Sequence, residues 1–246
     1  MRLTVVGCSG GHPSPDAACS AYLLEHQGFR LLLDLGSGAL GPLQNHIDPR
    51  DVDGVFLTHL HGDHWLDLVP LSHARTHHPD GRVPPPLRVI APGADRSRIL
   101  GAIGRSEESL ASVFAFEAPG DTVIGPLTAT VVRTRHPVEA YAVKLTAGAK
   151  TLVYTGDTGP FAELATFARG ADLLLAEAGF VDGVANPVGV HLTATQTGEL
   201  ARDADVGRLV VTHVAPWHDA GAQARAAGEA FGGPTDLARP GATFEV

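Results

Sequence analysis

The chain has 246 residues, of which 44% are hydrophobic and 18% are charged, so it can bury one substantial core and is not an intrinsically disordered chain. This size predicts a single domain over residues 1–246. The formal net charge of −9, without any lysine- or arginine-rich run, disfavours nucleic acid as a partner but is compatible with a small anion held by metal ions.

The chain begins MRLTVVGCSGG, a short apolar run that glycines soon interrupt, and this pattern does not resemble a signal peptide. No stretch approaches the roughly 20 apolar residues of a membrane helix. The two cysteines, Cys8 and Cys19, are too few for a disulfide framework. We expect a cytoplasmic, soluble protein that has no membrane partner.

Short β-type runs recur along the chain, and several are continuously apolar, as expected for strands buried on both faces. These runs are Leu3–Val6, Ala21–Leu24, Arg30–Leu33, Gly54–Leu57, Leu87–Ile90, Leu127–Arg133, Tyr141–Leu145, Thr151–Tyr154, Ala171–Leu175 and Arg208–Val211. Helical patterns lie between some of them, at Leu40–Asn45, Asp63–Thr76, Ala94–Gly101, Pro160–Ala168, Thr193–Ala204 and Gly221–Ala230. The alternation predicts an α/β fold built in layers.

Two pairs of segments resemble each other within the chain. FRLLLDLG at Phe29–Gly36 resembles TLVYTGDTG at Thr151–Gly159, and VFLTH at Val55–His59 resembles LVVTH at Leu209–His213. Each is an apolar strand that ends in a polar residue able to bind a metal ion. Two related halves would explain the likeness, and so would the shared composition of buried strands.

The segment VFLTHLHGDHWL places four polar side chains directly after an apolar strand. They are His59, His61, Asp63 and His64. We expect Gly62 to allow a sharp turn that other residues resist, so that these side chains share one pocket. Three imidazoles and a carboxylate within six residues suit Zn²⁺ or Mn²⁺. The alternative is a polar loop in which Asp63 caps a helix, and the HxHxDH spacing favours the metal site.

With this motif the chain resembles the metallo-β-lactamase superfamily. The resemblance implies a four-layer αββα sandwich with two metal ions, Zn²⁺ first and Mn²⁺ as the alternative, at one edge of the two sheets. The ligand sets that it implies are His59, His61 and His136 for one ion, and Asp63, His64 and His213 for the other. Asp157, in YTGDTGP, would bridge the two ions. Asp157, His136 and His213 each follow a run predicted above as a strand.

Two further positions resemble those of the transfer-RNA 3′-processing endonucleases, the RNase Z branch of this superfamily. His191 begins HLTATQTGELA, similar to their HxTA motif, and the resemblance implies a catalytic role beside the scissile phosphate. Glu177, in LLLAEAG, would support His191, and Asp63 would act in catalysis as well as in metal binding. A helix-capping turn and a solvated strand end are the respective alternatives for His191 and Glu177. Asp34 resembles a carboxylate that orients a metal-bound histidine, and it could equally cap the helix after Gly36.

In those endonucleases, the part of the chain that corresponds to the interval between His136 and Asp157 forms a long arm, and this arm grips transfer RNA. Here His136 and Asp157 are only 21 positions apart, and the predicted strands fill the interval. The chain is more similar to the atypical class II cyclic-AMP phosphodiesterases of actinobacteria, an armless offshoot of that group. The matching segments are LTVVGCSG, LTHLHGDHWLDL, YTGDTG, AEA, THVAPW and the terminal FEV.

The function implied by the resemblance is hydrolysis of a small phosphodiester, with cyclic AMP as the first candidate, by a hydroxide that bridges two metal ions. His191 would stabilise charge at phosphorus or protonate the leaving oxygen. The expected partner is the small substrate and not nucleic acid, and the resemblance implies a homodimer. The alternatives are an RNase Z-like nuclease, another ester hydrolase of the same fold, and a non-enzymatic metal-binding regulator. The last is disfavoured because all seven ligand positions are filled.

Overall fold

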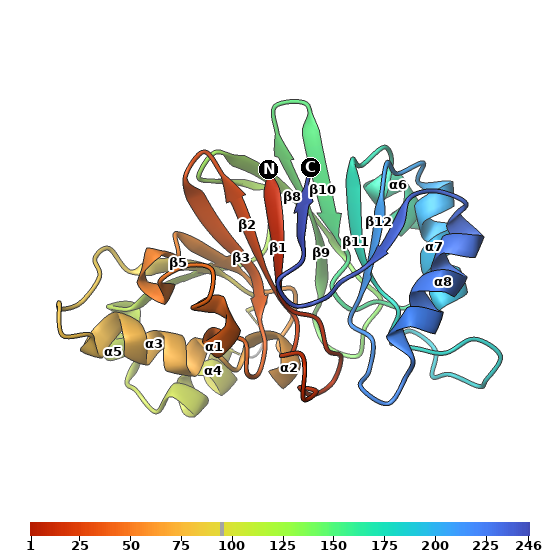
Figure 1. Cartoon of the computed structure of the whole chain (residues 1–246). Coiled ribbons are helices and arrows are strands. Elements are labelled where there is room, and N and C mark those ends of the chain that lie inside the picture. Colours follow the sequence, from red (N-terminus) through yellow and green to blue (C-terminus); the bar gives the residue numbers. More distant parts are fainter. Residues whose placement is uncertain (94–95) are drawn as a thin grey trace.

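Two seven-stranded β-sheets pack face to face, and helices cover the outer face of each sheet (Figure 1). The computed structural model describes residues 1–93 and 96–246. In spatial order the first sheet contains β14 (Thr243–Glu245), β1 (Arg2–Gly7), β2 (Ala21–His26), β3 (Phe29–Leu35), β4 (Gly54–Phe56), β5 (Leu87–Ile90) and β6 (Phe114–Glu117). The second contains β13 (Thr235–Leu237), β12 (Leu209–Thr212), β11 (Leu173–Glu177), β10 (Lys150–Tyr154), β9 (Tyr141–Ala147), β8 (Leu127–Arg133) and β7 (Thr122–Ile124).

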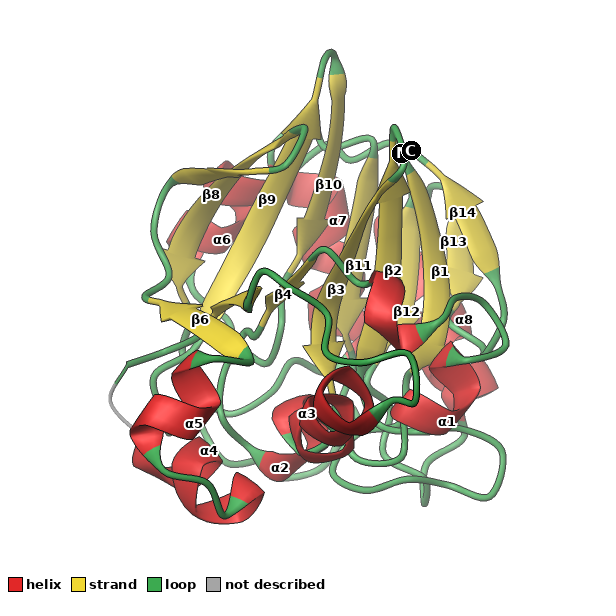
Figure 2. Cartoon of the chain, turned by 90° about the vertical axis from the view of Figure 1, so that its left-hand side faces the viewer, coloured by secondary structure: helices red, strands yellow, loops and turns green. Residues whose placement is uncertain are grey.

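The helices divide between the two outer faces (Figures 1 and 2). On the side of the first sheet lie α1 (Leu40–Leu43), the short 3₁₀ helix η1 (Pro49–Asp51), α2 (Gly62–Trp65), α3 (Leu68–His77), α4 (Arg96–Ile103) and α5 (Glu107–Ala111). On the side of the second lie α6 (Ala162–Ala168), α7 (Ala194–Asp203) and α8 (Ala220–Phe231). The αββα sandwich implied by the sequence is therefore confirmed. Within the described ranges, none of these helices has the length and apolar character needed to cross a membrane.

One of the predicted helices differs from the structure, and another begins outside the described residues. The helix predicted over Asp63–Thr76 is two helices, α2 and α3, because Asp67 lies between them and binds the start of α1. Its carboxylate accepts hydrogen bonds from the backbone N–H groups of Gly38 (3.0 Å) and Leu40 (2.7 Å). The helix predicted over Ala94–Gly101 begins at two residues outside the described ranges, and α4 follows them.

Successive side chains of a strand point to opposite faces of its sheet. Three apolar layers therefore form between the four layers of helices and sheets. In β3, Leu31 and Leu33 pack between the two sheets, whereas Leu32 faces the helices of the first sheet. In β12, Val210 packs between the sheets, whereas Val211 faces the helices of the second sheet. Strands buried on both faces need apolar residues at every position, which explains the continuous apolar runs of the sequence.

The two sheets share a pairing pattern, with three antiparallel pairings followed by three parallel ones. Counted from the antiparallel edge, β3 and β10 both take the fourth position. The likeness of FRLLLDLG to TLVYTGDTG therefore reflects equivalent places in two similar halves. By contrast, β4 is fifth in its sheet and β12 is sixth, so the likeness of VFLTH to LVVTH reflects only the composition of buried strands.

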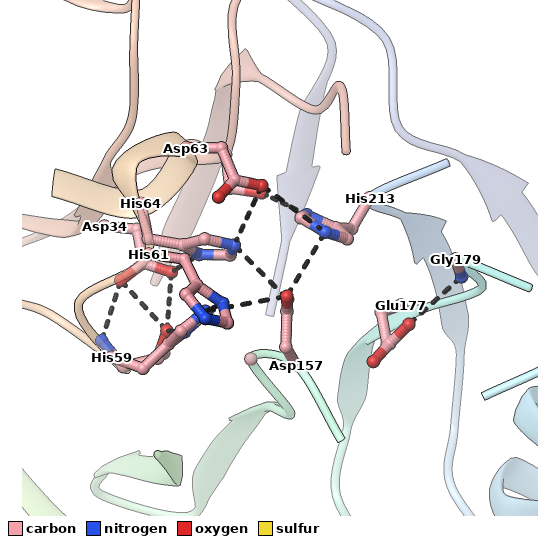
Figure 3. Close-up of polar contacts among 12 residues, drawn as sticks. Asp34, His59, His61, Asp63, His64, Asp157, Glu177, Gly179 and His213 are labelled. Atoms are coloured by element: carbon pink, nitrogen blue, oxygen red, sulfur yellow. Dashed lines mark hydrogen bonds and ion pairs between the residues drawn. The ribbon is translucent and has the colours of Figure 1, made fainter. Parts of the chain in front are cut away.

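The parallel strands determine where polar side chains meet. In the first sheet β3 and β4 run parallel, and in the second β10, β11 and β12 do so. Parallel strands end at the same edge of a sheet. Asp34 and His59 therefore lie at one such edge, and Asp157, Glu177 and His213 lie at the other. The two edges face each other across the sandwich (Figure 3).

Candidate metal centre

The four polar residues of the HxHxDH motif lie in the loop after β4 and in α2 (Figure 3). His59 and His64 are buried, whereas His61 and Asp63 are partly buried. The N-cap of α2 is His61, so Asp63 does not cap this helix. The expectation for Gly62 was wrong, because it is the first residue of α2 and its φ lies outside the left-handed region. The start of α2, and not a glycine turn, gathers these side chains.

One group consists of His59, His61, His136 and Asp157, whose ligand atoms all lie within 4.8 Å of one another. The Nδ1 atom of His61 lies 3.1 Å from Nε2 of His59 and 3.0 Å from Nε2 of His136. The Oδ2 atom of Asp157 lies 3.6 Å from Nε2 of His59. Nitrogens that bind one zinc ion tetrahedrally at about 2.0–2.1 Å lie about 3.3 Å apart. The spacing of these imidazoles thus fits one ion held among them.

The second group consists of Asp63, His64 and His213, and it shares Asp157 with the first. Oδ2 of Asp63 lies 3.5 Å from Nε2 of His64 and 3.7 Å from Nε2 of His213. Oδ1 of Asp157 lies 3.3 Å from His64, and its Oδ2 lies 3.3 Å from His213. The structure therefore brings all seven predicted residues together, with Asp157 between the two groups. This cluster is compatible with a dinuclear metal site.

Two polar atoms at the middle of the cluster lie 3.3 Å apart and form an ion-pair contact with each other. Within the described residues, Nε2 of His64 and Oδ1 of Asp157 are buried without a hydrogen bond. Native proteins seldom leave buried polar atoms unsatisfied, because the lost hydration is costly. A divalent cation would satisfy both atoms. Imidazole nitrogens with carboxylate oxygens are also a donor set that suits Zn²⁺ and Mn²⁺. The residues present therefore fit the metal ions that the sequence implies.

The cluster keeps its carboxylates charged. Burial opposes the charged form of Asp157, but His213, His64 and His59 outweigh burial and hold the pKa of this carboxyl well below its usual range. Burial also opposes protonation of His64, and the carboxylates of Asp157 and Asp34 nevertheless raise the pKa of that imidazole above its usual value. Burial lowers the pKa of His59. The negative charge concentrated on the carboxylates favours bound cations.

Asp34 lies in β3, is fully buried, and holds His64 in place. Its Oδ2 atom lies 2.8 Å from Nδ1 of His64 and accepts a hydrogen bond from the Tyr154 hydroxyl (2.8 Å). Its Oδ1 atom accepts the backbone N–H of Thr58 (2.7 Å). The N-cap of α1 is Ala39, so Asp34 does not cap that helix. Of the two interpretations of Asp34, the geometry favours the one in which it orients an imidazole of the cluster.

Two other imidazoles are held through the ring nitrogen that points away from the cluster. Nδ1 of His213 lies 2.8 Å from the Ser20 hydroxyl, and Nδ1 of His136 lies 2.9 Å from the backbone carbonyl of Val190. Such contacts fix the ring orientation and leave Nε2 for a metal ion. Ser20 and Val190 could not be found from the sequence, because these contacts join residues 193 and 54 positions apart.

Unusual backbone geometry brings parts of the cluster together. Asp34 and His213 have φ values of 58° and 55°, in the left-handed region that non-glycine residues avoid at a cost of about 1–3 kcal/mol. Gly156 has a φ of 54°, and a Cβ atom there would lie 2.8 Å from the side chain of Thr58. Glycine therefore allows the loop that carries Asp157 to approach the first sheet.

His191 lies beside the cluster and is held by Glu177. Nδ1 of His191 lies 3.0 Å from Oε1 of Glu177 and 3.8 Å from Oδ2 of Asp157. Glu177 is the last residue of β11, is completely buried, and accepts the backbone N–H of Gly179 (3.0 Å; Figure 3). It is therefore not a solvated strand end. The N-cap of α7 is Thr193, so His191 does not cap that helix.

The glycine-rich turn after β1 also borders the site, although the sequence by itself favoured a plain turn over a pocket edge. The backbone N–H of Gly11 donates a hydrogen bond to Oδ2 of Asp63 (2.8 Å). A Cβ atom on Gly10 would lie 2.6 Å from the carbonyl oxygen of His213, so this residue packs directly against the cluster. The signal available in the sequence was the position of GCSGG, directly after a buried strand.

The fold and the cluster together define an αββα protein with a His/Asp site, compatible with two metal ions, where strands of both sheets end. A family model described as the Beta-lactamase superfamily domain matches residues 29–214. The chain belongs to the metallo-β-lactamase superfamily, as its motifs suggested.

Relatives are similar to this chain over its whole length. An uncharacterized protein of Mycobacterium leprae is 37% identical over 260 residues, which cover 100% of this chain and 89% of that protein. The Bacillus subtilis protein named Probable metallo-hydrolase YhfI is 30% identical over 246 residues, which cover 100% of both chains. Its crystal structure, titled as a metallo-beta-lactamase fold protein, matches with a TM-score of 0.91 at 29% identity and covers 100% of this chain and 99% of that one.

A more distant relative is the protein named Ribonuclease Z of Haloferax volcanii. It is 28% identical over 308 residues, which cover 100% of this chain and 95% of that protein. The family, the relatives and the cluster agree that this chain is a metal-dependent hydrolase.

Proposed function

We propose that the protein is a dinuclear-metal phosphodiesterase that hydrolyses a small phosphodiester, with the 3′,5′-cyclic nucleotide cyclic AMP as the first candidate. The observation that carries this proposal is the pair of His191 and Glu177 beside Asp157. The seven converging residues alone would serve many hydrolytic reactions. A histidine held by a buried carboxylate would add a proton donor for the leaving oxygen, a contribution of about 10²- to 10⁴-fold to cleavage of a phosphate ester.

The metal ions, Zn²⁺ first and Mn²⁺ second, would be held by the two groups described above. When bound, they would neutralise phosphate charge and lower the pKa of water from 15.7 to about 7. We assign Asp63 a second task, which is to accept a hydrogen bond from the attacking water. The N–H of Gly11 holds the Asp63 carboxylate in place for that task.

His191 is the proposed general acid. Burial opposes its protonation, but the carboxylate of Glu177 outweighs burial and raises the pKa of His191 to about 9. The contact with Glu177 thus favours the protonated form of the imidazole. Because Nδ1 contacts Glu177, Nε2 is the nitrogen that can face a substrate. It would donate its proton to the leaving sugar oxygen or stabilise charge that builds up on the phosphate. Glu177 acts through His191 and is a positioning residue.

An RNase Z-like nuclease is the second candidate, favoured by the relative of that name. Two observations weigh against it. From His136 to Asp157 the chain forms only β9 and β10, joined by a turn at residues 148–149, which leaves no room for an arm that could grip RNA. The alignment with the ribonuclease spans 308 positions, more than the 246 residues of this chain, so that protein has segments that this one lacks. The net charge of −9 also suits a small substrate better than RNA.

The test is a substrate panel with the metal-loaded protein. Cyclic AMP, cyclic GMP, 2′,3′-cyclic nucleotides, bis-p-nitrophenyl phosphate and precursor transfer RNA are supplied in parallel, with and without prior chelation. We expect hydrolysis of cyclic AMP that chelation abolishes and Zn²⁺ or Mn²⁺ restores. Cleavage of transfer RNA alone would overturn the choice of substrate. Two bound metal ions without turnover of any ester would overturn the enzymatic proposal.

A further inference from the structure

Exposed apolar side chains gather around the metal centre. Among the described residues, the large exposed apolar side chains are Leu66, Val123, Val184, Val188 and Trp217. All except Val123 lie in segments that adjoin the cluster: after α2, between β11 and α7, and between β12 and α8. We call Leu66, Val184, Val188 and Trp217 the apolar rim. Apolar patches that stay exposed on a folded protein commonly mark binding surfaces.

Two parts of the rim reach the metal centre from different sides. A cavity of about 320 Å³ is lined by His191 together with Val184 and Val188. Trp217 reaches the other metal group through the turn after β1. Its ring atom Cη2 lies 3.9 Å from the position that a Cβ on Gly11 would take, and the N–H of Gly11 binds Asp63. With ordinary backbone dimensions, this places the indole edge within roughly 9 Å of the Asp63 carboxylate.

The indole of Trp217 is exposed but held in one orientation. Its Nε1–H donates a hydrogen bond to Nε2 of His218 (3.1 Å), and 67% of its surface is accessible. The ring of His12 is tilted by 43° to the indole, and that of His218 by 69°, so neither imidazole lies flat against it. A large aromatic surface that is fixed in position and left uncovered is suited to stacking with a flat ligand.

We propose that Trp217 is the stacking platform for the heteroaromatic base of a nucleotide whose phosphate lies at the metal centre. This inference rests on the proposed phosphodiesterase function and adds the feature that selects nucleotides among small phosphodiesters. A neutral base needs no charged partner, and it can stack on an indole whatever its identity. Phosphate chemistry at the metals and base binding at Trp217 are then separate tasks of neighbouring loops.

The kinetic test compares a substrate that has a base with one that lacks it. Trp217→Ala should raise KM for cyclic AMP by about 5- to 150-fold, the range that corresponds to the loss of one stacked base. It should leave hydrolysis of ribose 3′,5′-cyclic phosphate, which lacks a base, within about twofold of the wild type. Trp217→Phe should recover most of the loss. Val123→Ala is the matched control, because Val123 is 62% exposed and lies in β7, outside the rim.

Fluorescence provides a second measurement that does not require turnover. The chain has two tryptophans, and Trp65 is only 4% exposed, so ligand-dependent quenching reports on Trp217. Adenosine monophosphate should quench the wild type and leave Trp217→Phe unchanged, whereas ribose 5-phosphate should quench neither. If the wild type cleaves no ester but adenosine monophosphate still quenches it, the proposed function fails and the stacking platform stands.

Three outcomes would overturn the platform and leave the proposed function intact. The first is cleavage of cyclic AMP with an unchanged KM in Trp217→Ala. The second is an equal loss on both cyclic phosphates, which would make Trp217 a structural residue. The third is an emission maximum that shifts to shorter wavelength with protein concentration, which would show that a second copy of the chain covers the indole.

Discussion

The metal centre and the apolar rim lie side by side, but their side chains are held in different ways. In the centre, His59, His64 and Asp157 are at most 2% exposed, and contacts from both sheets fix their orientation. In the rim, Val188 is fully exposed and Trp217 is 67% exposed. Folding therefore holds the centre in place, whereas the rim remains available for a ligand.

Under the proposed function, this difference assigns the reaction to the metal centre and the choice of substrate to the apolar rim. With two divalent cations bound, the centre would polarise any phosphoryl oxygen that reaches it, so under the proposed function it would not choose among phosphoesters by itself. The residues that surround the centre must make that choice. Substitutions in the centre should therefore impair every substrate alike, and substitutions in the rim should change the ranking of substrates. The following variants test this division, from the largest expected effect to the smallest.

Asp157→Asn should have the largest effect, because this residue lies between both metal groups. We expect loss of bound metal and a fall in kcat/KM of at least about 10³-fold on every substrate, since the lost Lewis-acid stabilisation amounts to several kcal/mol. Metal analysis and hydrolysis assays measure both effects. Asp80→Asn, the same chemical change at an exposed loop residue, is the control. An Asp157→Asn protein that keeps two metals and full activity would refute the bridging role.

His191→Ala should reduce catalysis without removing metal. Loss of a general acid costs about 10²- to 10⁴-fold in kcat. His191 lies outside the two groups predicted to hold the ions, but its ring nitrogen also comes within 4.8 Å of ligand atoms of Asp157 and His213, so metal content distinguishes an acid from a ligand. Metal content should remain within error of the wild type, and KM should change little. His73→Ala, on the exposed face of α3, controls for the loss of an imidazole. Parallel losses of metal and activity would show that His191 is a ligand and not an acid.

Asp34→Asn should weaken metal binding by about 10- to 100-fold, the usual effect of losing a partner that orients a ligand. Asp34 accepts hydrogen bonds from Thr58 and Tyr154 and contacts His64. An amide in its place would turn an NH2 group, itself a hydrogen-bond donor, towards groups that also donate. Competition with a chelator measures the affinity. Excess Zn²⁺ should restore activity here, although it should not do so in Asp157→Asn. Failure of metal to rescue would mean that Asp34 supports catalysis by another route.

The interior of each sheet could be predicted from the sequence, and its edges could not. All ten predicted strands exist, and the four that were missed, β14, β6, β13 and β7, are the four edge strands. Interior strands are apolar at every position because both of their faces are covered. An edge strand such as Thr235–Leu237 is short and only partly buried, so it lacks that pattern. Its pairing partner, and not its own composition, makes it a strand.

The residues of the candidate site were likewise only partly predictable from the sequence. The HxHxDH spacing indicated a metal site by itself, whereas the ligand roles of His136, Asp157 and His213 came from the resemblance. Asp157 and His213 follow strands of the parallel set, whose ends meet at one edge. Ser20, Tyr154 and Gly11 were not predictable, because their contacts join segments that meet only in the folded chain. Trp217 was part of a matching motif, THVAPW, yet only the structure shows that its ring stays exposed beside the centre. Whether the seven residues bind metal stays a prediction that metal analysis will test.

Val188→Ser should have the smallest effect and would sharpen the contrast between the two regions. Val188 is fully exposed, so the free energy of unfolding should change by less than about 0.5 kcal/mol. Metal content and hydrolysis of the base-free cyclic phosphate should match the wild type, and KM for cyclic AMP should rise by no more than about threefold, because a single exposed methyl pair contributes little contact area. Urea unfolding and steady-state kinetics measure these quantities. A loss of stability above about 1 kcal/mol would show that this part of the rim supports the fold, and the separation of reaction from selectivity would then not hold on the His191 side of the centre.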